Sequence, residues 1–249
     1  MRGVVIILLS IVLWSCNGEN VPDCFQNAGD IIEKDFDVNA FSEIIVFPRV
    51  ELIITDAPVQ GVTVQTGEYL MEDIEVIVEE GQLKVYNNNS CNLTRDYGLT
   101  KVFVSAPNLT KITNGSSLPV RSNGVLTYDS LELISEDFNE ENNVNTDGNF
   151  ILEVNCDNFR VVVNNLSSCF ISGQANTAYV GFFSGDARFE GRHFITQDMT
   201  VFQRSSNDMI INAQQSIIGE IRSTGDVILV NTPVTVDVEQ FYTGQLIFE

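Results

Sequence analysis

The chain has 249 residues, of which 13 are Lys or Arg and 34 are Asp or Glu, so its formal net charge at pH 7 is −21. Such a charge repels phosphate backbones and anionic lipid headgroups, which excludes nucleic acid as a partner and limits membrane contact to a lipid anchor. The cysteines include no C-x-x-C pair, which argues against a structural zinc site.

The N-terminal stretch MRGVVIILLSIVLWSCNGEN has one Arg, an apolar run from Val4 to Trp14, and then Cys16. The run is shorter than the roughly 20 apolar residues that cross a bilayer, so residues 1–15 are predicted to be a cleaved export signal. The stretch LWSC resembles a bacterial lipobox, which makes Cys16 the lipidated first residue and residues 16–35 a tether. The alternative is an ordinary secreted protein cut nearby. Loss of Arg2 with the signal changes the net charge from −21 to −22.

Residues 36–108 show the period-two alternation of β-strands. In IEVIVEEGQLKVY, Ile74, Val76 and Val78 point one way, and the apolar side resumes at Leu83 after the turn at Gly81. This pattern predicts a hairpin, and no run of a dozen residues has a 3.6-residue period. The sequence therefore predicts an all-β chain that begins with an antiparallel β-hairpin region.

Residues 109–249 are repetitive. The segments FFSGDARFEG, FQRSSNDMII, EIRSTGDVIL and QFYTGQLIF align Asp186, Asp208, Asp226 and Gln245 at spacings of 22, 18 and 19 residues. A repeat near 20 residues that contains a strand, a polar turn and another strand predicts a parallel β-helix (β-solenoid). About six coils fit between residues 109 and 249, and residues 36–249 are predicted to form one continuous domain.

The four remaining cysteines allow three pairings in an exported protein. We expect Cys156 to pair with Cys169, and Cys24 to pair with Cys91 so that the N-terminal arm is tied to the body. The alternative is that all four are free thiols buried as small apolar residues.

The aligned carboxylates need an explanation, because neighbours on stacked strands lie about 4.8 Å apart and would repel one another. Three arrangements relieve the repulsion: Ca²⁺ bound between coils, pairing with the flanking Arg204 and Arg222, or capping of turn amides by each Asp. The last two are structural. Calcium is the only cofactor that the pattern leaves open, and we otherwise expect none.

The order of features resembles the head GIN domain family of adhesin-like exported proteins of Bacteroidota. The resemblance rests on AFSEIIVFPRVELIIT, GVTVQTGEYLMEDIEVIVEEGQLKVYNN, KVFVSAPNLTKITNGSSLPVRSNG and the turns SGD and STGD. It implies a β-helical fold and carries over no catalytic residue. The chain departs from the Gly-rich pattern at ISEDFNEENNVNTDGN, where an irregular coil is expected.

These features predict a lipid-anchored protein of the bacterial outer membrane, facing the periplasm or the cell surface, that binds a glycan or an envelope or host protein without catalysis. The alternative is a polysaccharide lyase or hydrolase, since stacked sheets form grooves and the Asp column supplies paired carboxyls. His193, the only histidine, has no Ser or Cys nearby and is expected to lie on the surface.

Overall fold

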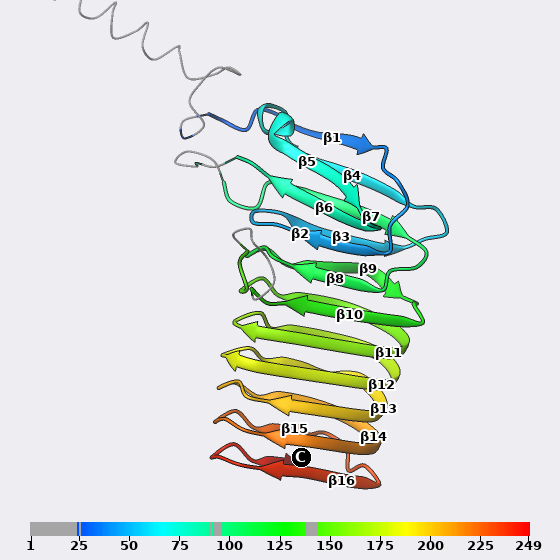
Figure 1. The fold of residues 1–249 in the computed structure, drawn as a ribbon, viewed down its shortest axis with the longest axis vertical. Helices are drawn as coiled ribbons and strands as arrows, with labels where there is room; N and C mark the ends of the chain where they lie inside the picture. Colours follow the sequence, from blue (N-terminus) through cyan, green and yellow to red (C-terminus); the bar gives the residue numbers. More distant parts are fainter. Residues whose placement is uncertain (1–23, 25, 90, 92–95, 138–143) are drawn as a thin grey trace, which may run out of the picture.

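The computed structural model describes residues 24, 26–89, 91, 96–137 and 144–249 and shows an all-β protein, as predicted. All of its strands belong to one 17-stranded sheet, in which the strands are stacked along the long axis of the molecule with β1 at one end and β16 at the other (Figure 1). The only helix among the described residues is the short 3-10 helix η1 (Glu68–Asp73). The strands are β1 (Ile31–Phe36), β2 (Glu43–Val46), β3 (Glu51–Asp56), β4 (Gly61–Gly67), β5 (Ile74–Glu79), β6 (Gln82–Asn87), β7 (Lys101–Ala106), β8 (Lys111–Asn114), β9 (Val120–Leu126), β10 (Ser130–Ser135), β11 (Phe150–Asn165), β12 (Cys169–Gly185), β13 (Phe189–Gln203), β14 (Met209–Ile221), β15 (Val227–Leu229), β16 (Thr235–Gln240) and β17 (Leu246–Phe248).

The strands from β8 onward form two stacks of parallel strands. The first stack contains β8, β10, the second halves of β11 to β14, and β16; the second stack contains β9, the first halves of β11 to β14, β15 and β17. We call a stretch that adds one strand to each stack a coil. In the second stack the paired residues are Phe150, Cys169, Phe189, Met209, Val227 and Leu246, at steps of 19, 20, 20, 18 and 19 residues.

Each coil buries alternate side chains and interrupts the alternation where the chain bends from the second stack to the first. In β11, Phe150, Leu152 and Val154 are buried, two exposed residues follow Cys156, and burial resumes at Phe159. Strands β12 and β13 repeat this pattern, so the buried side chains of successive coils lie above one another. One apolar core therefore runs through the molecule from Phe41 to Leu229.

The N-terminal region differs from the expected hairpin region, because it also contributes coils to both stacks. Strands β2 and β3 pair in parallel with β8 and β9 on one side, and with β6 and β7 on the other. Antiparallel pairing is confined to β5 with β6, and to β4 with β7 and β1. Glu80 and Gly81 connect β5 to β6 with φ of 51° and 79°, the two positive values of a type I′ hairpin turn.

One coil is longer than the others. Ser130 of β10 lies opposite Asn158 of β11, a step of 28 residues, whereas Asn158 lies opposite Thr177 after 19. The additional residues belong to the acidic segment that departs from the Gly-rich pattern. Residues 138–143 of this segment lie outside the described residues.

Amide side chains hold two of the corners between the stacks. Gln203 accepts a hydrogen bond from Ser205 N (3.1 Å) and donates one to Asn207 O (2.6 Å). Asn114 does the same with Ser116 N (3.0 Å) and Leu118 O (3.1 Å). Because Gln203 is fully buried, its amide satisfies backbone groups that water does not reach. The corner residues thus fold back onto their own turn.

We predict that Gln203→Met lowers the free energy of unfolding by about 1–3 kcal/mol, since it leaves a buried N–H and a carbonyl without partners. The matched control is Gln174→Met, which changes an exposed amide of β12 and should cost less than about 0.5 kcal/mol. Chemical denaturation monitored by circular dichroism measures the free energy of unfolding of both variants. Equal destabilisation of the two variants would contradict a role for the Gln203 amide in the corner.

Candidate functional site

One of the three aspartates predicted to form a column, Asp186, does not belong to it. Phe189 pairs with Met209, so the residue that lies opposite Asp208 is Arg188 and not Asp186. Arg188 Nη1 lies 3.7 Å from Asp208 Oδ2, which places opposite charges on neighbouring coils. Asp186 lies outside the row, where its Oδ1 accepts a hydrogen bond from Ser206 Oγ (2.6 Å). Only Asp208 and Asp226 remain as carboxylates on adjacent coils.

The residues of this row bond to the backbone of the following coil. We call the row the corner ladder; its members are Asn149, Ser168, Arg188, Asp208, Asp226 and Gln245. Asn149 Oδ1 accepts from Ser168 N (3.0 Å), and Ser168 Oγ accepts from Arg188 N (3.2 Å). Asp208 Oδ1 accepts from Asp226 N (3.0 Å), and Asp226 Oδ1 accepts from Gln245 N (2.8 Å). The only step without such a bond is the one where Arg188 pairs with Asp208.

Amide capping therefore accounts for the two carboxylates, although the capped amide belongs to the next coil. The two arginines predicted to pair with them do not do so in the described structure. Arg222 Nε binds Glu220, and its guanidinium lies 4.1 Å from the ring centroid of Phe241. The side chain of Arg204 forms no ion pair with a described residue. Within the described ranges, no three acidic, His or Cys side chains come close enough to hold a metal ion.

We predict that Asp208→Ala costs about 0.5–1.5 kcal/mol of stability because the N–H of Asp226 loses its acceptor, while Asp208→Asn retains most of it. Thermal denaturation compares the two variants. Addition of 5 mM CaCl₂ or of a chelator should leave the melting temperature of the wild-type protein unchanged. A rise in that temperature with Ca²⁺ that disappears in Asp208→Asn would instead assign a cation to the row.

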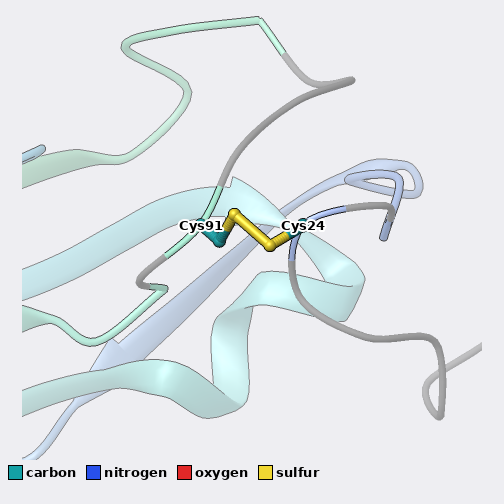
Figure 2. Close-up of a disulfide and its surroundings, with 2 residues drawn as sticks. All are labelled: Cys24 and Cys91. Atoms are coloured by element: carbon teal, nitrogen blue, oxygen red, sulfur yellow. A yellow bond between two sulfur atoms is a disulfide. The ribbon is translucent and has the colours of Figure 1, made fainter.

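The cysteines form one of the two expected disulfides. Cys24 and Cys91 are joined across a sequence separation of 67 residues, so the segment before β1 is tied to the one after β6 (Figure 2). The expected bond between Cys156 and Cys169 is absent, and both are free and buried. Cys169 pairs with Phe150 and Cys156 with Ala175, so the two thiols lie at different places on the coil. Six strand residues, about 20 Å of chain, separate the two columns.

Burial also makes these thiols unreactive. It raises the pKa of Cys156 to about 11, although a hydrogen bond from the Tyr128 backbone opposes the shift, and it raises the pKa of the Cys169 thiol further. Because the thiolate is the nucleophile, neither cysteine is poised for covalent catalysis.

We predict that Cys91→Ser lowers stability by about 2–5 kcal/mol, because the cross-link restricts a long loop of the unfolded chain. The loss should appear as a lower denaturation midpoint, and a reductant should produce the same shift in the wild type. Cys24→Ser/Cys91→Ser serves as the control and should be insensitive to the reductant. A reductant effect in that double variant would show that another group is responsible.

A groove of about 460 Å³ crosses the outer face of the first stack. Three of its lining residues, Glu132, Arg160 and Tyr179, continue a row of outward residues on successive coils that begins with Glu43 and Lys111, and we call this row the outer column. Charges alternate along this row, with Lys111 Nζ 2.5 Å from Glu43 Oε2 and Arg160 Nε 2.8 Å from Glu132 Oε1. The groove itself is lined by Glu132, Arg160, Tyr179, the polar side chains of Thr110, Ser130, Asn158, Thr177 and Thr200, and the buried apolar side chains of Leu131, Phe159 and Ala178.

Tyr179 is the aromatic element of the groove. The Arg160 guanidinium lies 4.3 Å from the Tyr179 ring centroid. A Cβ at Gly181 would lie 2.6 Å from Tyr179 Oη, so the ring occupies the space that a side chain at residue 181 would take. The ring is therefore positioned from two sides. The contact between Arg160 and Tyr179 was not predicted from the sequence, because it depends on the register between β11 and β12.

A second depression of about 380 Å³ lies on the outer face of the second stack, where Phe170, Glu190, Arg192 and His193 line it. Arg192 is held by Glu249 through two contacts of 2.6 and 3.0 Å. His193 lies on this outer face, as expected for a surface histidine, and no cysteine or aspartate lines the depression with it. Contrary to the expectation from the sequence, Ser122 and Ser172 line the same depression as His193, but within the described residues no hydrogen bond joins His193 to either serine.

The described strands form one sheet around a shared apolar core, which places the chain among all-β proteins. The family model described as "Putative auto-transporter adhesin, head GIN domain" matches residues 40–233. The chain therefore belongs to the head GIN domain family, which confirms the resemblance seen in the sequence.

Solved structures from Bacteroidales share this fold. A "putative adhesin" from Bacteroides fragilis is 17% identical in sequence and superimposes with a TM-score of 0.78. The match covers 90% of this chain and 99% of that chain. A "putative adhesin" from Parabacteroides distasonis is 12% identical with a TM-score of 0.64, over 90% and 99%. A "putative lipid binding protein" from the same species is 11% identical with a TM-score of 0.63, over 89% and 97%.

None of the curated proteins matches the chain. At these identities the structural neighbours establish the fold and leave ligands and partners open. Among the described residues, no helix is long and apolar enough to cross a bilayer. Cys16 and the predicted export signal lie outside the described residues.

Proposed function

We propose that the chain is an exported, envelope-associated binding module of the adhesin type, folded as a parallel β-helix. The family and the structural neighbours support an adhesin-like role. The parallel register of the two stacks, at steps of 18 to 20 residues, supports the β-helix. The apolar run before Cys16 supports anchoring to the outer membrane through a lipid on that residue, facing the periplasm or the cell surface.

The single observation that carries the binding role is the groove of the first stack. It combines the partly exposed aromatic ring of Tyr179 with hydroxyl and amide groups from neighbouring coils. An aromatic face next to hydrogen-bonding groups suits a sugar ring, which has an apolar face and a polar rim. Arg160 is already paired with Glu132, and the chain is strongly acidic, so a neutral glycan fits better than an anionic one.

This lining also favours a glycan over an acyl chain. One structural neighbour is named as a lipid binding protein. A lipid tail requires an enclosed apolar cavity, whereas most side chains that line this groove are polar. A protein partner remains the second ligand class that the binding role allows.

We further propose that binding occurs without turnover. The carboxylates that a polysaccharide hydrolase would require, Asp208 and Asp226, accept hydrogen bonds from backbone amides in the corner ladder. Asp186 binds Ser206 at a different position. A glycosidase requires two carboxyls on either side of the scissile bond, and these side chains serve the stacking of the coils instead.

We predict that the purified protein binds a neutral oligosaccharide and that Tyr179→Ala weakens binding about tenfold, which corresponds to about 1.4 kcal/mol. A glycan array would identify the oligosaccharide, with cello-, manno- and xylohexaose as soluble probes for titration calorimetry. Phe170→Ala, which removes an aromatic side chain from the second stack, is the matched control and should bind as the wild type does.

Three outcomes would contradict these proposals separately. Absence of binding to every neutral glycan, together with Tyr179-dependent binding of an envelope protein, would replace the ligand class. Equal losses in Tyr179→Ala and Phe170→Ala would remove the assignment to the first stack. Release of reducing or unsaturated sugars that is abolished by Asp208→Asn or Asp226→Asn would show an enzyme.

A further inference from the structure

The two ends of the strand stacks are finished differently. At the N-terminal end, β5 and β1 run antiparallel to the strands beneath them, and the Cys24–Cys91 disulfide ties the adjoining segments together (Figures 1 and 2). At the other end, β16 pairs with β14 alone and β17 with β15 alone. Within the described chain, the outer edges of β16 and β17 therefore have no strand partner.

Apolar side chains are exposed at this open end. Val236 and Phe248 occupy inward positions of the last coil, yet they are 39% and 50% exposed because no described coil covers them. Val234 is 82% exposed, and Phe241 and Tyr242 are also exposed. Unpaired strand edges combined with exposed apolar residues form a surface suited to strand pairing.

The backbone of β16 presents a defined set of groups to this surface. Phe241 N donates to Ile221 O, so alternate residues back to Thr235 direct their N–H and C=O groups toward β14. By the same alternation, Val236 and Val238 direct theirs outward. These residues lie in the segment VTVDV, residues 234–238, in which every second residue is valine.

We propose that the open end is a self-association surface, on which β16 of a second copy of this chain pairs antiparallel about a two-fold axis at Val236. In this register Val236 lies opposite Val236 of the second copy, Val234 opposite Val238, and Thr235 opposite Asp237. A two-fold axis normal to the sheet that joins two copies end to end presents their β16 edges antiparallel. The outward N–H and C=O groups of Val236 then bond to those of its counterpart.

The charged residues of β16 favour both this register and a second copy of the chain as the partner. A shift that centres the axis on Asp237 places two carboxylates directly opposite each other, and one centred on Val238 places Asp237 opposite Glu239. The Val236 register matches every valine of the segment to a valine and Asp237 to a neutral residue. Because β16 carries no basic residue and a β16 edge already complements itself, a second copy fits without help from another partner. The proposal is independent of the glycan groove.

The test is site-specific cross-linking of the mature protein in the bacterial membrane. In the proposed register the two Cα atoms of residue 236 lie about 5.5 Å apart, within the range of a disulfide. We expect Val236→Cys to give a disulfide-linked dimer on a non-reducing gel. Val234→Cys should not, since two 234 positions are separated by about four residues of strand, roughly 13 Å. Val234→Cys/Val238→Cys should cross-link again.

Two controls distinguish pairing from random collision. Among the described residues of the wild type, the free thiols are those of Cys156 and Cys169, and because both are buried the wild type should stay uncross-linked. Val125→Cys places a thiol on β9 at 43% exposure, close to that of Val236, and should also stay monomeric. Equal cross-linking of Val234→Cys and Val236→Cys would overturn the proposed register.

A second measurement does not depend on introduced cysteines. Light scattering on the detergent-purified wild-type protein should give twice the mass of one chain, and Val236→Asp should halve it. Val125→Asp is the matched control and should leave the dimer intact. A wild-type protein that remains monomeric at about 100 µM would overturn the proposal, whatever the behaviour of the variants.

Discussion

The structure depends on the parallel hydrogen bonding of each coil to its neighbours. A single coil of about 20 residues cannot bury its own apolar side, and it becomes stable only when coils above and below cover it. In-register stacking then imposes a second constraint, because each position is repeated every 4.8 Å or so along the stack. Apolar columns satisfy this constraint easily and form one core, whereas charged columns require a partner at each step.

The protein meets the second constraint in two ways. The outer column alternates acid and base at Glu43, Lys111, Glu132 and Arg160, so each charge lies beside one of opposite sign. The corner ladder instead turns each carboxylate toward a backbone N–H of the next coil, so Asp208 and Asp226 act as links between coils. Asp208 and Asp226, which look like a candidate site in the sequence, are therefore part of the stacking, and the glycan site that we propose lies instead on the outer face around Tyr179.

The sequence predicted the all-β class and the repeat, because strand periodicity and turn residues are local signals. It misplaced Asp186, because the similarity of SGD to SND aligned the turns, whereas the register is set by the apolar residues Phe189 and Met209. The expected pairing of Cys156 with Cys169 was wrong, because the two thiols occupy different columns of the coil. The position of β2 and β3 between the β6–β7 and β8–β9 coils was also beyond its reach, since periodicity does not say which strands become neighbours.

That arrangement of the first coils has a consequence for how the chain is assembled. Leu52 of β3 meets Val120 of β9 only after 68 further residues have been made, whereas from β11 onward each coil meets its neighbour after about 20. The slow loop closures are thus concentrated at the N-terminal end, and the later coils need only short ones. Once the first coils and the antiparallel strands β1 and β5 at the N-terminal end are formed, they offer a template for the rest. The same logic lets the length of the molecule change by whole coils, with the N-terminal end left as it is.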